Sequence, residues 1–270
     1  MPSSLVCGSG LRSLALAATG LFFSSPQMAQ VVFTFDTSPT LSPTPVPGAW
    51  AVDRYAPAGF DSVFFDGDNR LRHSISAADG EVGRPSAFSS TFYNTQGRQY
   101  LIPNTTTIQA DLYIPSDWAS TERRMAGLWG TAVDETDTIS AFPIVEFIST
   151  TDGSGLPRFR HWNGTGCTDM GLPTGFAYDS WYTLGITLQA DSEFEFTVGD
   201  LSFTSTTFAL GNSTDFRNII LQGHNDNAGV SYDIYWDNVV IPEPATLALM
   251  AVGATALLAR RRAARKAPAA

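Results

Sequence analysis

The sequence is poor in lysine and cysteine, and each shortage limits what the protein can be. Its 270 residues include a single lysine, Lys266, and two cysteines. Cys7 lies near the start, so Cys167 is alone in the body of the chain and cannot form a disulfide within it. A body of about 210 residues buries enough apolar surface to fold without disulfides. With no catalytic partner evident beside it, Cys167 is expected to be buried or inert.

Positive charge is also scarce outside the two ends. Residues 31–241 contain ten arginines and 25 acidic residues, which is a formal net charge of −15. A surface this acidic repels phosphate backbones, so we predict no nucleic-acid partner. Calcium ions and neutral glycans are compatible with such a surface.

Contiguous catalytic motifs are missing as well. The three histidines lack metal-binding spacing, and neither a Gly-x-Ser-x-Gly elbow nor a phosphate-binding glycine loop occurs. The segment "DSEFE" places Asp191, Glu193 and Glu195 at alternate positions, which predicts a solvated strand face opposite an apolar one. Because no coherent catalytic constellation is visible, we predict that the protein is not an enzyme and assign it no catalytic residue.

The first 30 residues have the order of a secretory signal peptide. Arg12 precedes a short apolar stretch, Leu14 to Phe23, and small and polar residues follow it. Ten apolar residues make about 15 Å of helix, too short for a hydrocarbon core of about 30 Å. We therefore predict that residues 1–30 are a signal peptide, with cleavage after Ala29.

The other end carries a longer apolar segment. Ala245 to Ala259 contains no charge, and three arginines follow at Arg260, Arg261 and Arg262. Fifteen residues make about 22 Å of helix, which arginine snorkelling or a thinner bilayer extends to a full span. We predict a single C-terminal transmembrane helix in the inner membrane, with this basic cluster on the cytoplasmic side.

A Pro-Glu-Pro triplet, Pro242, Glu243 and Pro244, stands directly before that apolar segment. Triplet, apolar helix and arginine cluster, in this order over residues 242–266, closely resemble the PEP-CTERM sorting signal of Gram-negative bacteria. The resemblance implies that exosortase, a membrane-embedded protease, processes the chain near the triplet and that the product reaches the cell surface or an extracellular polysaccharide matrix. A simple uncleaved anchor is the alternative interpretation.

The body between the two ends has the pattern of an all-β protein. Short alternating segments such as "TIQADLYI" (107–114), "EFEFTV" (193–198) and "YDIYWDNVVI" (232–241) are separated by Gly, Asn and Asp. Segments of this kind predict strands of an antiparallel two-sheet sandwich. Residues 31–241 are expected to form one domain, in which "SPTLSPTPVPG" (38–48) is a proline-rich loop.

The second half of the body resembles the concanavalin-like, laminin-G-type jelly rolls. The resemblance rests on "FPIVEFI", "RFRHWNG", "DSWYTLGITL", "EFEFTVGD" and the closing "YDIYWDNV". It implies a two-sheet jelly roll with a concave face that often binds glycans. Laminarinase-type glycoside hydrolases carry a Glu-x-Asp-x-Glu strand motif, from which "DSEFE" departs at both leading positions.

Two further sets of residues are candidates for binding. Asp36 and Asp237 meet if the first and last strands pair, and they are a possible structural Ca²⁺ site. The oxygen-rich loops at 66–69 and 225–227 are separate candidates. Trp118 and Trp162 adjoin loops and are possible glycan-stacking platforms. The ordinary alternatives are turn-forming Asp and Asn side chains and core aromatics.

Two functions are compatible with these features. The first is an exported surface or matrix protein, processed by the exosortase system, that acts as a non-catalytic structural or glycan-binding module. The alternative is a glycan hydrolase or lyase on a jelly-roll scaffold.

Overall fold

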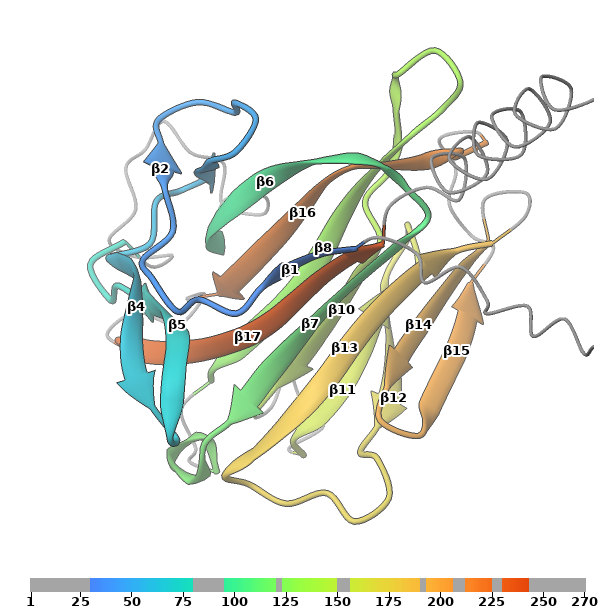
Figure 1. Ribbon diagram of the computed structural model, residues 1–270. Helices are drawn as coiled ribbons and strands as arrows, with labels where there is room; N and C mark the ends of the chain where they lie inside the picture. Colours follow the sequence, from blue (N-terminus) through green and yellow to red (C-terminus); the bar gives the residue numbers. More distant parts are fainter. Residues whose placement is uncertain are drawn as a thin grey trace, which may run out of the picture.

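The protein is a sandwich of two β-sheets packed face to face (Figure 1). The computed structural model describes residues 30–79, 95–119, 123–149, 156–189, 193–205, 212–224 and 230–242. Neighbouring strands are antiparallel throughout these residues, except that β2 runs parallel to β3. The predicted all-β, antiparallel two-sheet fold is confirmed.

Sheet A has the strand order β15-β14-β13-β7-β17-β5-β4, and β1 pairs with the C-terminal part of β17. Its strands are β1 (Gln30–Phe33), β4 (Gly59–Phe65), β5 (Asp68–Ile75), β7 (Thr107–Ile114), β13 (Ser180–Leu188), β14 (Phe194–Val198), β15 (Leu201–Ser205) and β17 (Tyr232–Pro242).

Sheet B has the order β12-β11-β10-β8-β16-β6-β3-β2, and β9 pairs with β8. Its strands are β2 (Leu41–Ser42), β3 (Trp50–Arg54), β6 (Thr95–Thr105), β8 (Met125–Val133), β9 (Ile139–Ala141), β10 (Ile144–Ile148), β11 (Arg158–Trp162), β12 (Cys167–Gly171) and β16 (Asp215–His224). A short 3₁₀ helix, η1 (Ser116–Trp118), follows β7.

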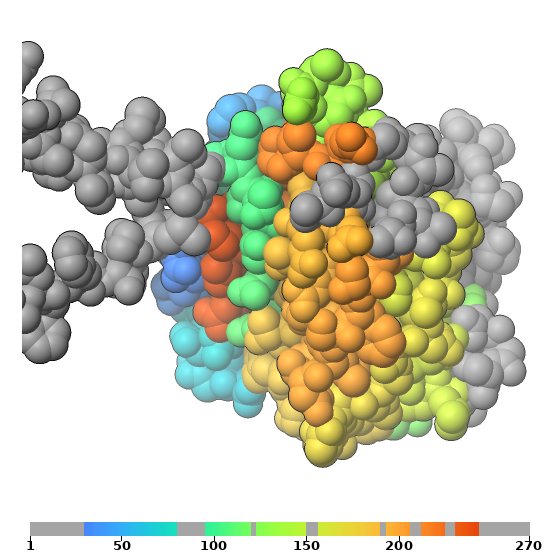
Figure 2. All heavy atoms as spheres, turned by 90° about the vertical axis from the view of Figure 1, so that its right-hand side faces the viewer, coloured from blue at the N-terminus to red at the C-terminus, as the bar shows by residue number. Residues whose placement is uncertain are grey.

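Alternation of apolar and polar residues places the core between the sheets. In β14, Phe194, Phe196 and Val198 are fully buried while Glu195 and Thr197 point outward. The β14–β15 side of the molecule, orange in Figure 2, is a closely packed surface. In this part of sheet A one face is apolar and buried, and the other is polar and faces solvent, as the sequence predicts.

The central strands of sheet B differ, because they are buried on both faces. All nine residues of β8 are buried, and so are the last seven of β16. Only alternate residues of these strands reach the core between the sheets, so the others are shielded on the outer face of sheet B. Buried polar side chains lie together on this outer face.

Two local expectations need correction. The proline-rich segment 38–48 is not only a loop, because Leu41 and Ser42 form β2 and pair with the start of β3. Cys167 lies on the edge strand β12 and is exposed, in no disulfide, rather than buried.

Candidate functional site

A row of directly paired residues crosses the outer face of sheet B. In antiparallel sheets, residues opposite one another on neighbouring strands share a face. The strand register therefore aligns six residues from six adjacent strands, β11, β10, β8, β16, β6 and β3: Arg160, Glu146, Gly127, Gln222, Gly97 and Asp53.

This row points away from the core. The next residues along the same strands, Phe147, Leu128 and Leu221, belong to the buried cluster between the sheets, and successive side chains of a strand face opposite ways. We call the row, together with its flanking side chains Arg54, Trp129 and His224, the outer-face cluster.

Two glycines form part of the floor of this cluster. A Cβ on Gly127 would lie 2.8 Å from the Cβ of Glu146 and 3.0 Å from Nε1 of Trp129. One on Gly97 would lie 2.7 Å from Oε1 of Gln222. The longer side chains of the row therefore lie across the sheet in space that any other residue at these positions would fill.

Glu146 lies near the β11 end of the row, next to Arg160. It is 3% exposed, and its Oε1 accepts a hydrogen bond from Arg160 Nε at 2.7 Å, with the Arg160 guanidinium as close as 2.6 Å. Its Oε2 lies 3.2 Å from Nε2 of His224, without the alignment of a full hydrogen bond. One buried carboxylate thus contacts two basic groups from neighbouring strands.

The charge of Glu146 is fixed by these two neighbours. Burial alone would raise its pKa, but the charges of His224 and Arg160, with the hydrogen bond from Arg160, outweigh burial and lower the pKa from 4.5 to about 2. Glu146 is therefore an anion at neutral pH. A carboxylate held in this way can orient the His224 ring.

Asp53 lies at the other end of the row. Its Oδ2 accepts hydrogen bonds from Arg54, at 2.6 Å, and from the amide of Gln222. Burial raises the pKa of Asp53 above its ordinary value even though Arg54 and Gln222 act in the opposite direction. The two buried carboxyl groups of the cluster thus have pKa values shifted in opposite directions, as acid and base groups of active sites often do.

Trp129 lies between the two ends of the cluster. The Arg54 guanidinium stacks over its ring at 4.7 Å, and the His224 ring meets it edge to face at 5.8 Å. Its indole N–H is buried without a hydrogen-bond partner among the described residues, and so are Oε1 of Gln222 and Oε2 of Glu146. Buried polar atoms in native proteins usually have a hydrogen-bond partner, so these atoms are available to a ligand or to water.

The arrangement supplies acid–base groups but not the usual pair of adjacent carboxylates. Glu146 and Asp53 are four strand spacings apart, about 19 Å between Cα atoms, with Gln222 between them. Retaining glycosidases place their carboxyl groups about 5 to 5.5 Å apart. Among the described residues of the cluster, Glu146 and His224 are the carboxylate and imidazole in direct contact.

The two predicted tryptophans have different fates. Trp118 is 0% exposed and packs against Phe147 and Tyr232 in the core, so its assignment as a glycan-stacking residue is wrong. The short helix η1 turns the ring inward although the neighbouring loop is at the surface. Trp162 is half-buried on β11 and pairs through Ile144 with Trp129, which places it on the outer face beside the cluster.

The predicted calcium ligands are already engaged with other groups. Asp237 forms an ion pair with Arg70, and Asp36 accepts a hydrogen bond from the Thr34 hydroxyl at 2.7 Å. The described residues contain no group of three or more His, Cys, Asp or Glu side chains arranged to hold a metal. Residues 225–227 lie outside the described part, and the Ca²⁺ site stays a prediction.

Glu195 of the segment "DSEFE" lies on the opposite sheet from the cluster. Glu195 projects from the outer face of sheet A and accepts hydrogen bonds from Gln189, at 2.9 Å, and Ser202, at 2.7 Å. This is the solvated strand face that the sequence predicts. Asp191 lies outside the described residues.

The sorting triplet begins inside the folded body. Pro242 is the last residue of β17 and pairs with Gln30 of β1, so the first and last described strands leave the sandwich side by side (Figure 1). Glu243, Pro244, the arginines at 260–262, the predicted signal peptide and the predicted transmembrane helix lie outside the described residues. Among the residues that are described, none belongs to a helix long and apolar enough to cross a membrane.

Sequence reasoning missed the outer-face cluster because its members come from strands far apart in the chain. A signal was nevertheless present. Glu146 is a single acid inside the apolar segment "FPIVEFI", and Arg158 and Arg160 alternate in "RFRHW". Charged residues are almost never buried unless they are paired, so each segment indicates that the other carries its partner.

Comparison with known proteins identifies the C-terminal segment. Residues 240–262 match the PEP-CTERM protein-sorting motif. The predicted sorting signal is confirmed, and it implies export, membrane anchoring and processing by exosortase. No curated protein matches the whole chain at a significant level.

Solved structures with a similar fold include glycanases. One is a GlcNAcα1-4Gal-releasing endo-β-galactosidase from Clostridium perfringens, with 12% identity and a TM-score of 0.52 over 83% of this chain and 65% of that one. A second is a β-glucanase from Bacillus licheniformis, with 11% identity and a TM-score of 0.45 over 80% of this chain and 98% of that one. A third is a mucin-degrading O-glycanase of the human gut microbiota, with 13% identity and a TM-score of 0.47 over 79% of this chain and 99% of that one. At this identity the likeness shows the jelly-roll fold and not the activity.

The expectation that the protein is not an enzyme is contradicted by these comparisons. The endo-β-galactosidase, the similar structure described above with a TM-score above 0.5, is a glycoside hydrolase. The expectation depended on the lack of a contiguous catalytic motif. A search for contiguous motifs does not detect acid–base groups that come from different strands. Cross-strand pairing brings Glu146, Arg160 and His224 together in this way.

Proposed function

We propose that this exported protein cleaves a polysaccharide at the cell surface or in the extracellular matrix of a Gram-negative bacterium, as a glycan hydrolase or lyase on a jelly-roll scaffold. The outer-face cluster is the proposed site. The observation that carries the proposal is the buried contact of Glu146 with both Arg160 and His224 on a sheet face that also bears unpartnered polar atoms.

The form of the face supports a glycan as the substrate. The row crosses six strands, with Gly127 and Gly97 in its floor. Trp162 lies beside it at the β11 side and offers an aromatic surface on which a sugar ring can stack. An extended sugar chain laid across the strands would pass the stacking residue, the acid–base groups and the amide of Gln222 in turn.

His224 is the proposed proton-transferring group and Glu146 its orienting partner. An imidazole has one nitrogen that accepts a proton and one that donates, whereas the pKa of Glu146, at about 2, makes the carboxylate a weak proton acceptor. The Glu146 carboxylate, 3.2 Å from Nε2, fixes the orientation of the His224 ring. Arg160 holds the carboxylate in place from the other side.

The test is cleavage of purified polysaccharides by the full chain in detergent micelles. One neutral β-glucan and one uronic-acid polymer are incubated with the wild type and with His224→Asn, and new reducing ends are counted. We expect cleavage by the wild type and a loss of about 10²-fold or more in the variant, which is the usual contribution of acid–base catalysis.

Product chemistry then separates the two reaction classes. Hydrolysis yields saturated products from either polymer, whereas elimination yields an unsaturated sugar from the uronic-acid polymer and is detected by its ultraviolet absorbance. The matched control is Glu195→Gln on the outer face of sheet A, which should cleave as the wild type does. Equal cleavage by the wild type and His224→Asn would refute the assignment of the site.

A further inference from the structure

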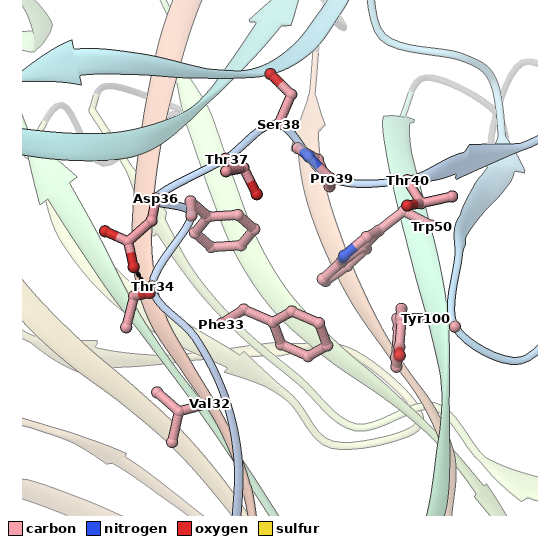
Figure 3. A pocket seen from close by; sticks show the side chains of 12 residues that line it. Val32, Phe33, Thr34, Asp36, Thr37, Ser38, Pro39, Thr40, Trp50 and Tyr100 are labelled. Carbon is pink, nitrogen blue, oxygen red and sulfur yellow. Dashed lines mark hydrogen bonds between the residues drawn. The ribbon is translucent and has the colours of Figure 1, made fainter.

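A cavity lies between the sheets, away from the outer-face cluster. It has a volume of about 310 Å³ and is lined by β1, by the segment that follows it to Thr40, and by Gly48, Trp50 and Tyr100 of the β3 and β6 side (Figure 3). Pockets for small ligands start at about this size. The cavity has room for one ring-sized ligand and not for a chain that runs through it.

Aromatic rings form one side of this cavity. Phe33 meets Tyr100 edge to face at 4.8 Å and Trp50 at 5.7 Å, and Trp50 lies 5.3 Å from Tyr100. The rings come from β1 of sheet A and from β3 and β6 of sheet B, so the wall exists only when the sandwich is closed. Adjoining rings of this kind present an apolar surface with fixed geometry.

The rim of the cavity carries polar groups. Thr34, Asp36, Thr37, Ser38 and Thr40 line it, and Thr34 and Asp36 are exposed and hydrogen-bonded to each other. These groups come from a single stretch of chain that crosses the mouth of the cavity (Figure 3). One apolar wall and one hydroxyl-rich rim match the two sides of a sugar ring, whose C–H face stacks on aromatics while its hydroxyl groups hydrogen-bond.

Two observations indicate that this is a binding site and not a packing gap. The indole N–H of Trp50 is buried, with the residue 1% exposed, and has no hydrogen-bond partner among the described residues; in Figure 3 its nitrogen faces the cavity. Phe35, which bends the chain over the mouth, has a φ of 55°. A bulky residue in the left-handed region is strained, and such strain gathers at functional sites.

We propose that this cavity binds one neutral sugar ring, the terminal residue of a glycan chain. The only ionisable carboxylate among its lining residues is Asp36, and its negative charge disfavours uronic acids. The indole N–H of Trp50 donates to a ring hydroxyl, and the aromatic wall stacks against the ring. The inference rests on the proposed glycan function and adds an anchoring site that is separate from the site of cleavage.

The test is titration of the full chain in detergent with glucose, galactose, N-acetylglucosamine and glucuronate, followed by calorimetry and tryptophan fluorescence. We expect saturable binding of at least one neutral sugar in the millimolar range and none of glucuronate. Trp50→Phe removes the N–H and keeps an aromatic ring, and it should weaken binding at least tenfold. The indole N–H of Trp181, on β13 of sheet A and outside both proposed sites, donates a hydrogen bond to Asp66 at 2.8 Å. Trp181→Phe is therefore the matched control and should bind as the wild type does.

Because Trp50 lies in the core, a second variant keeps the proposal open to refutation if Trp50→Phe unfolds. Thr37→Trp adds bulk at the exposed rim and should abolish binding while the thermal midpoint stays within about 2 °C of the wild type. Retained sugar binding in Thr37→Trp, or wild-type saturation by none of the neutral sugars, would overturn the proposal. His224→Asn separates the two sites, because it should lose cleavage and keep sugar binding.

Discussion

Replacement of Glu146 by glutamine tests the electrostatic basis of the site through protein stability. The pKa of Glu146 falls from 4.5 to about 2 on folding. A shift of this size corresponds to about 3 kcal/mol at 1.36 kcal/mol for each pKa unit, and burial of the side chain means that solvent screening removes little of it. Glu146→Gln also leaves Arg160 and His224 without their anion, which costs a similar amount when a buried pair is broken.

The expected loss is therefore about 3 kcal/mol at pH 7. For a chain of this size it corresponds to a fall of about 6 to 12 °C in the midpoint of thermal unfolding, measured by circular dichroism alongside urea titration of both proteins. Glu195→Gln makes the same chemical change on the outer face of sheet A and should change stability by less than about 0.5 kcal/mol.

The pH dependence gives the sign of the effect. A carboxylate whose pKa is depressed on folding contributes stability above its unfolded pKa and loses it as the pH falls toward the folded value. The difference between the wild type and Glu146→Gln should accordingly shrink from pH 4.5 toward pH 2. A difference below 0.5 kcal/mol at pH 7, or one that stays constant across this range, would refute the ion-pair account.

Three further predictions concern other parts of the molecule. Burial lowers the pKa of His73 from 6.5 to about 3, so below pH 6.5 the unfolded chain binds a proton that the folded chain does not, and the wild type should lose stability from pH 6.5 to pH 3. The free energy of unfolding of His73→Gln, measured with urea, should change less with pH over this range. Equal pH dependence of the two proteins would contradict the prediction. Gly127→Ala places a Cβ 2.8 Å from that of Glu146 and should reduce polysaccharide cleavage at least tenfold, while Gly166→Ala, with open space around it, should not; equal activity of the two variants would count against the glycine floor. Alanines at 242–244 should keep the protein in the membrane fraction at its unprocessed mass, whereas identical fractionation and mass spectra for both proteins would mean that the triplet is not used.

The fold was predictable from local pattern, because apolar alternation fixes which face of a strand is buried. Phe194, Phe196 and Val198 opposite Glu195 illustrate this, and the structure buries the first three. Trp118 shows the limit of such reasoning, because a neighbouring loop does not determine whether a ring turns outward, and here η1 directs it into the core.

The site was less predictable because it depends on register between distant strands. Glu146 and His224 are 78 positions apart in the chain. The pairing of β10 with β8 and of β8 with β16 places Oε2 of Glu146 3.2 Å from Nε2 of His224. A single sequence indicates that a buried Glu146 needs a cationic partner, but it does not identify which cation. The cavity at Trp50 likewise requires both sheets to be in place.

Hydrogen–deuterium exchange of the full chain, with and without the polysaccharide that it cleaves, tests the location of the site most directly. The account predicts slower exchange in peptides from β8, β10 and β16 when the glycan is present, and unchanged exchange in β14 and β15. Slower exchange confined to β14 and β15, with β8, β10 and β16 unaffected, would contradict it.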